Sequence, residues 1–183
     1  MRLKLALAAL ALPLAMMPAN ASLPAGAKAP VFTAKGAVAG KPINVDLKAA
    51  LKKGPVVLYF FPAAFTSGCN AEAHAFAEAL PDFTKAGATV IGMTAGNVDQ
   101  LEQFSSQYCA GKFAVAAASP EIAQGYDVLM KKPDGTAAKY TTRTSFVIAP
   151  DGKVLFVHSD PNPADHIRLT LAAVQNYRKT HKG

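Results

Sequence analysis

The chain has few of the features that mark membrane-spanning, nucleic-acid-binding or repeat proteins. Beyond residue 21, no apolar stretch is long enough to span a bilayer, so we expect no stable membrane association. The formal net charge is +7, but the lysines are scattered and clustered only in short pairs, which disfavours a nucleic-acid partner. Repeats, low-complexity tracts and internal linkers are lacking, so residues 22–183 are predicted to form one domain.

The first 21 residues have the pattern of a secretory signal peptide. Arg2 and Lys4 precede an almost unbroken run of Ala, Leu, Pro and Met, and Ala19-Asn20-Ala21 fits a cleavage site. The apolar run is short for a bilayer span, which disfavours an uncleaved anchor. We therefore expect residues 1–21 to be removed and the remainder to be exported, to the periplasm or out of the cell.

Cysteine is scarce, because only Cys69 and Cys109 are present. An even count in an exported chain suggests a disulfide, and composition does not distinguish a permanent bridge from one formed during catalysis. Three of the histidines, His158, His166 and His181, are separate in the sequence and lack the spacing of metal ligands. No metal site is predicted.

Hydrophobic patterning predicts alternating strands and helices. Strands are expected at 56–61, 89–93, 113–117, 144–149 and 154–158, with a small hairpin over 32–45 and a turn at 133–135. Helices are expected at 47–53, from 67 or 69 to 86 with a kink or restart at Pro81, at 97–108 with Asn97 as cap, at 120–124, and from Pro163 to about 178. This order predicts an α/β layer fold with a mostly parallel sheet and one antiparallel edge.

The junction between strand 56–61 and the following helix carries the candidate chemistry. Cys69 lies at the start of that helix, where the helix dipole favours a thiolate. Pro62 fixes the backbone and could shield the sulfur, and the Thr66 hydroxyl could accept from a backbone amide or bind the thiolate and an incoming oxygen. Arg143 begins a strand expected beside 56–61, so its guanidinium should stabilise the thiolate and bind a polar substrate.

The motif Pro62-x-x-x-Thr66-x-x-Cys69, which follows Val-Val-Leu-Tyr-Phe-Phe, resembles that of the peroxiredoxins when taken with Arg143 in Thr-Arg-Thr-Ser-Phe-Val-Ile. It is most similar to their bacterioferritin-comigratory or peroxiredoxin Q branch, from about Ala25 to the C-terminus. The resemblance implies a thioredoxin-like fold with a central mixed β-sheet flanked by helices. It also implies a thiol peroxidase that needs no metal, flavin or haem.

The same resemblance implies roles for the site residues. Cys69 would attack the O–O bond of a hydroperoxide and become a sulfenic acid. Thr66 and Arg143 would hold the peroxide, and Pro62 would screen the sulfenic acid from over-oxidation. Glu72 could orient Arg143; its alternative is a solvated acid in the first helical turn.

A resolving cysteine is expected five residues after Cys69 in many members of the branch, but that position is His74, which is expected to be a surface residue. Cys109 is therefore the candidate resolving residue, and it would form an intramolecular disulfide with Cys69 after local unwinding. Otherwise an external thiol would be needed. The implied partners are a hydroperoxide and a thiol reductant, either thioredoxin-like or small, and the protein is expected to be a monomer or weak dimer.

Other classes of function lack residues that they need. An exported thiol–disulfide oxidoreductase usually needs a Cys-x-x-Cys motif. The positions three residues before and after Cys69 are Thr66 and Glu72, so neither supplies the second cysteine. A copper chaperone on a similar fold would need a Cys-x-x-x-Cys motif, but the residue four positions after Cys69 is Ala73. The alternative of a structural protein with one stable disulfide is not excluded by the sequence. Phe65 is a candidate for lining the peroxide pocket, whereas Tyr59 is expected in the core.

Overall fold

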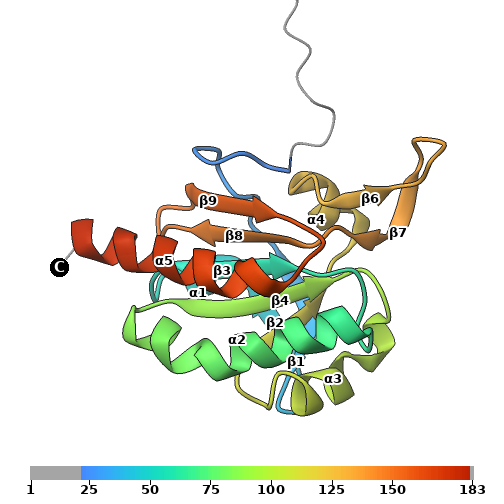
Figure 1. The fold of residues 1–183 in the computed structure, drawn as a ribbon, viewed down its shortest axis with the longest axis horizontal. Helices are drawn as coiled ribbons and strands as arrows, with labels where there is room; N and C mark the ends of the chain where they lie inside the picture. Colours follow the sequence, from blue (N-terminus) through green and yellow to red (C-terminus); the bar gives the residue numbers. More distant parts are fainter. Residues whose placement is uncertain (1–21, 182–183) are drawn as a thin grey trace, which may run out of the picture.

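The computed structural model describes residues 22–181 (Figure 1). The predicted signal peptide lies outside the described residues, so its cleavage stays a prediction. No helix within the described range is long and apolar enough to cross a membrane.

A seven-stranded sheet in the order β2-β1-β5-β4-β3-β8-β9 forms the centre of the fold. The strands are β1 (Thr33–Val38), β2 (Lys41–Asp46), β3 (Val56–Phe60), β4 (Thr89–Thr94), β5 (Ala114–Ala117), β8 (Thr144–Ile148) and β9 (Val154–Ser159). Only the β3–β4 and β4–β5 pairs are parallel. The expectation of a mostly parallel sheet is wrong, because a hairpin flanks the parallel strands on each side and adds antiparallel pairs.

Helices cover both faces of this sheet. They are α1 (Leu47–Leu51), α2 (Ser67–Lys85), α3 (Leu101–Gln107), α4 (Pro120–Gly125) and α5 (Ala164–Thr180). Packing places α2, α3 and α5 on one face, and α1 and α4 on the other (Figure 1). The central mixed sheet flanked by helices is thus confirmed.

Strand β3 explains how the two layers of the core are built. It is buried along its whole length, as its unbroken apolar sequence predicts. Because side chains alternate along a strand, Val57 and Tyr59 pack with α2 and α3, whereas Leu58 and Phe60 pack under α1 and α4. The carboxyl end of β3 therefore emerges at the centre of the sheet, beside the start of α2.

Three local expectations differ from the structure. Helix α2 is continuous through Pro81. Asn97 occupies the N-cap position of a 3₁₀ turn, Val98–Gln100, that precedes α3, but its backbone is left-handed (φ 56°) and its side chain makes no capping hydrogen bond. A small two-stranded sheet, β6 (Leu129–Lys131) and β7 (Ala137–Thr141), flanks the predicted turn at 133–135. These strands have three and five residues, of which only Thr141 is buried, so they show little hydrophobic alternation and only their turn was predicted.

Candidate active site

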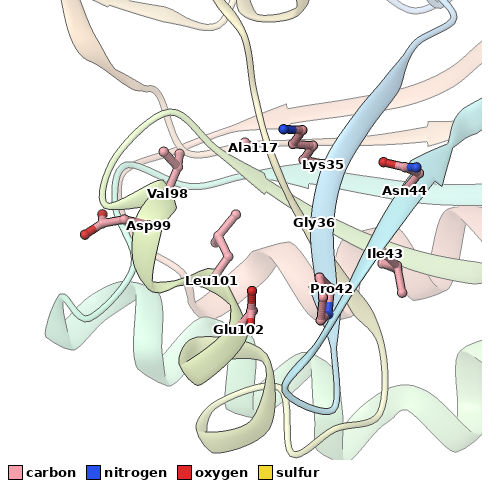
Figure 2. A pocket seen from close by; sticks show the side chains of 10 residues that line it. All are labelled: Lys35, Gly36, Pro42, Ile43, Asn44, Val98, Asp99, Leu101, Glu102 and Ala117. Atoms are coloured by element: carbon pink, nitrogen blue, oxygen red, sulfur yellow. The ribbon is translucent and has the colours of Figure 1, made fainter.

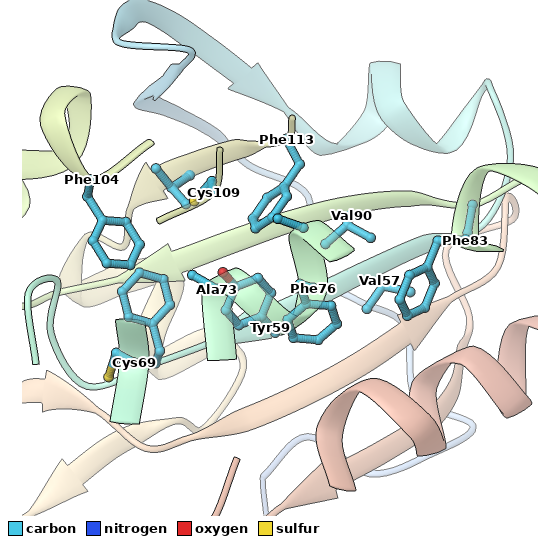
Figure 3. Packing of buried hydrophobic residues seen from close by; sticks show 14 of the residues in the cluster. Val57, Tyr59, Cys69, Ala73, Phe76, Phe83, Val90, Phe104, Cys109 and Phe113 are labelled. Atoms are coloured by element: carbon cyan, nitrogen blue, oxygen red, sulfur yellow. The ribbon is translucent and has the colours of Figure 1, made fainter. Parts of the chain in front are cut away.

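Cys69 lies in the first turn of α2, at the carboxyl end of β3. Thr66 has an extended backbone and ends the loop, and α2 begins at Ser67. The first amides of a helix have no intrahelical partner, so they create a positive environment around this turn. The side chain is buried, with 1% of its surface exposed. Figure 3 shows its sulfur pointing away from Cys109.

The guanidinium of Arg143 is held against Cys69 by three contacts. Nε donates to the carbonyl of Pro161 at 2.9 Å, Nη1 pairs with Oε2 of Glu72, and Nη2 donates to Sγ of Cys69 at 3.5 Å. Antiparallel pairing of β8 with β3 produces this placement, because it sets Thr144 opposite Phe60. Arg143 therefore precedes β8 at the level where β3 ends and the loop to α2 begins.

Glu72 is fully buried one turn after Cys69, on the same side of α2. The alternative of a solvated helix acid is wrong, since the carboxylate pairs with Arg143. Burial raises the pKa of Glu72 to about 8, although the Arg143 charge and hydrogen bond act in the opposite direction. The second carboxylate oxygen, Oε1, has no hydrogen-bond partner among the described residues.

His166 on α5 extends this site and was not predicted as part of it. Its ring is fully buried, with Nδ1 2.8 Å from the Ser145 hydroxyl and Nε2 2.9 Å from the Asp160 carbonyl. Nδ1 also lies 3.8 Å from Oε1 of Glu72. Burial lowers the pKa of His166 to about 4, so the ring is neutral near pH 7.

The histidines are not all separate in the fold. The rings of His158 and His166 pack edge to face, with centroids 4.6 Å apart. Within residues 22–181, no group of three His, Cys, Asp or Glu side chains is placed to hold a metal ion. The four-residue spacing of His166 and Thr170 on the buried face of α5 is the one sequence signal that could have indicated burial.

Thr66 does not accept from a backbone amide, so that expectation is wrong. Its hydroxyl donates to the carbonyl of Ala63 at 3.1 Å, and no side-chain cap of α2 forms. The residue is exposed, and its hydroxyl oxygen retains lone pairs beside the first turn.

The loop that contains Pro62 is tied to the segment after β4. Thr94 Oγ1 donates to the Pro62 carbonyl at 3.0 Å, and Asn97 Nδ2 donates to the Ala64 carbonyl at 2.8 Å. Asn97 is thus a residue that the sequence pattern assigned to a helix cap and the structure assigns to anchoring this loop. Pro62 itself is half-buried.

Cys109 follows α3 and is fully buried in the same apolar cluster as Cys69. Both thiols are free, and burial raises the pKa of Cys109. The aromatic rings of Phe65 and Tyr108 each pack against Phe104, with centroids 5.7 and 5.5 Å away. Figure 3 shows Cys69 and Cys109 on different sides of a group of aromatic rings to which Phe104 belongs.

Two further surface features lie outside this constellation. His74 is exposed and lies 3.3 Å from Glu78, so it takes no part in the site. A groove of about 600 Å³ lies between the β1–β2 hairpin and the start of α3, and residues such as Lys35, Val98 and Glu102 line it (Figure 2). None of the predicted site residues lines the groove.

Comparison with known proteins agrees with this geometry. The model of the AhpC/TSA family matches residues 25–157. Peroxiredoxin Q of Suaeda salsa chloroplasts is 31% identical, and the match covers 82% of this chain and 67% of that protein. Peroxiredoxin Bcp of Xanthomonas campestris is 28% identical, with 68% and 78% covered. The crystal structure of peroxidoxin BcpB from Mycobacterium tuberculosis has a TM-score of 0.74 at 28% identity, with 84% and 97% covered.

These similarities define a thioredoxin-like peroxidase, an oxidoreductase that acts on peroxides with thiol reductants. The chain belongs to the AhpC/TSA family and, within it, to the Bcp and peroxiredoxin Q branch of the peroxiredoxins.

Proposed function

We propose that Cys69 is the thiol that reacts with peroxide and that Arg143 is the group that activates it. The observation that carries this assignment is the 3.5 Å contact between Nη2 of Arg143 and Sγ of Cys69 at the N-terminus of α2. Two positive environments, the guanidinium and the helix end, favour the thiolate. Cys109 lacks both, and its burial among apolar side chains disfavours its thiolate.

The reaction transfers one oxygen to sulfur. The Cys69 thiolate attacks the terminal oxygen of a hydroperoxide, the S–O bond forms and the O–O bond breaks. Cys69 becomes a sulfenic acid, and the leaving alkoxide or hydroxide takes up a proton to become an alcohol or water. Arg143 and the Thr66 hydroxyl hold the two peroxide oxygens and stabilise the charge that develops on the leaving one. Pro62 limits access to the sulfenic acid.

Cys109 is the proposed resolving residue. Its thiolate displaces hydroxide from the Cys69 sulfenic acid, giving an intramolecular disulfide and, after protonation, water. Because both thiols are buried, the first turn of α2 and the segment after α3 must unwind first. Two features support an opening there: a left-handed backbone at Phe65 (φ 62°) next to Thr66, and another at Ala110 (φ 48°) next to Cys109.

The burial of Cys69 limits which peroxides can reach it. The nearly complete burial of this residue favours hydrogen peroxide and slim organic hydroperoxides. A thioredoxin-like or small thiol then reduces the disulfide. The signal-peptide pattern of residues 1–21 supports an exported enzyme, so the reductant would also lie outside the cytoplasm. We expect a monomer or weak dimer without stable membrane association.

Peroxide consumption by the reduced protein tests this function. With a dithiol reductant present, wild type should remove hydrogen peroxide repeatedly, and Cys69→Ser should not. Equal rates for the two proteins would refute the assignment of Cys69. Reduction of insulin without peroxide consumption would instead favour a thiol–disulfide oxidoreductase.

A further inference from the structure

The hydrogen bonds of His166 fix where its proton lies. A backbone carbonyl only accepts, so the 2.9 Å contact between Nε2 and the Asp160 carbonyl places a hydrogen on Nε2. In a neutral imidazole the other nitrogen, Nδ1, then carries a lone pair. Nδ1 is the atom that faces Glu72.

One oxygen of Glu72, on the side that faces His166, has no hydrogen-bond donor among the described residues. Oε1 of Glu72 is buried without a hydrogen-bond partner among the described residues, and it lies 3.8 Å from Nδ1 of His166. The Ser145 hydroxyl, 2.8 Å from Nδ1, donates its one hydrogen to the Nδ1 lone pair, so no hydrogen is left for Oε1 of Glu72. A buried carboxylate oxygen without a donor, 3.8 Å from the acceptor nitrogen of a neutral ring, is costly, and a proton on Oε1 removes that charge.

We propose that Glu72 and His166 hold one proton between them in the active enzyme, and that His166 is thereby a positioning residue for the peroxide reaction. The inference rests on the roles proposed above for Cys69 and Arg143. With the proton bound, Glu72 is neutral, and the charge of Arg143 serves the Cys69 thiolate and the leaving oxygen. Without it, a buried carboxylate competes for the same guanidinium.

The environment of the pair agrees with a shared proton. Burial raises the pKa of Glu72 to about 8 and lowers that of His166 to about 4, which keeps the proton on the Glu72 side near pH 7. Since the groups interact, the titration belongs to the pair. The other titratable or charged groups that face it are Cys69 on α2, Tyr59 on β3, Arg143 before β8, His158 on β9, Asp160 after β9 and Asp165 on α5.

A pH profile of Cys69 oxidation tests the proposal. The chain has no tryptophan, so single-turnover reactions should be quenched by thiol alkylation and followed by mass spectrometry. The wild-type rate constant should fall as pH rises through about 8. In His166→Gln the amide keeps a donor for Asp160 but removes Nδ1. The fall should then begin about one pH unit lower, a tenfold loss in proton affinity.

The exposed His74 provides a matched control on α2. His74→Gln should keep the wild-type profile. A wild-type rate without an alkaline fall, or the same midpoint in His166→Gln, would overturn the inference while Cys69 oxidation itself persisted. Failure of the proposed function is distinct, because Cys69→Ser would then retain activity.

A measurement on the wild-type side chains covers the case in which His166→Gln does not fold. Nitrogen-15 NMR of labelled histidine should show His166 protonated at Nε2 near pH 7, and the Nδ1 signal should shift near the pH at which the rate falls. That shift should be absent in Glu72→Gln. A hydrogen on Nδ1 in the neutral ring, or a shift retained in Glu72→Gln, would contradict the shared proton.

Discussion

Gly68 leaves the space that Arg143 occupies beside α2: a Cβ atom at position 68 would lie 3.2 Å from Nη2 of Arg143. That nitrogen is the one that donates to Cys69. The absence of a side chain at position 68 therefore sets how closely the guanidinium approaches the sulfur.

Gly68→Ala should separate stability from activity. Alanine favours a helix over glycine, so the free energy of unfolding should be unchanged or rise by up to about 1 kcal/mol. Arg143 must move by a few tenths of an ångström, so the rate constant of Cys69 oxidation should fall. Ser67→Ala, at the neighbouring exposed position, is the control and should keep the rate. An unchanged rate in Gly68→Ala would show that the approach of Arg143 is not limiting.

Two buried tyrosines should respond in opposite ways to loss of their hydroxyl groups. The Tyr59 hydroxyl is buried with no hydrogen-bond partner among the described residues, whereas that of Tyr126 donates to the Pro30 carbonyl at 2.8 Å. In urea unfolding, Tyr59→Phe should raise the free energy of unfolding by about 1 kcal/mol, and Tyr126→Phe should lower it by about 1 kcal/mol. Destabilisation by Tyr59→Phe would mean that its hydroxyl is paired.

The buried carboxyl of Glu72 should make stability depend on pH. Its pKa is about 8 in the folded protein against 4.5 for a freely solvated glutamate side chain, so the native state binds the proton more tightly. This contribution is complete below pH 4.5 and is lost as pH rises through about 8. The stability of wild type relative to Glu72→Gln should therefore fall between those values in urea unfolding. A relative stability that rose with pH would indicate a Glu72 carboxylate that is ionised throughout.

Cys109→Ser should uncouple the first step from the second. The variant should still reduce one equivalent of peroxide, because Cys69 and Arg143 are unchanged. It should lack the intramolecular disulfide that peroxide-treated wild type forms, and turnover should then depend on external thiol. Absence of that disulfide from oxidised wild type, measured by mass spectrometry under non-reducing conditions, would refute the resolving role.

The sequence was sufficient for the parts of the fold and site that depend on local pattern. The apolar run 56–61 and the helical spacing after it predicted β3 and α2, and a helix start next to a strand end placed Cys69. Arg143 was placed near Cys69 because it begins an apolar strand, β8, that the order of the elements along the chain predicts to lie beside β3. These features depend on short segments of sequence, and the rules of strand connection leave each such segment only a few possible neighbours in the sheet.

Polar contacts between residues far apart in the chain could not be predicted from the sequence. Burial of Glu72 and His166 depends on how α2, β8 and α5 pack together, and no spacing within either helix reveals a partner on another element. Asn97 was assigned to a cap because asparagine favours caps, but the same residue type also tolerates a left-handed backbone and here binds the loop at Ala64. Tertiary packing decided between the two uses.

Trapping the first oxidised sulfur tests the central claim most directly. Reduced wild type should be given less than one equivalent of hydrogen peroxide together with a sulfenic-acid-specific probe and then analysed by peptide mass spectrometry. Because Arg143 contacts Cys69 and Cys109 is buried in an apolar cluster, the account predicts the adduct on Cys69 and none on Cys109. A first adduct on Cys109, or peroxide consumption without any adduct on Cys69, would contradict it.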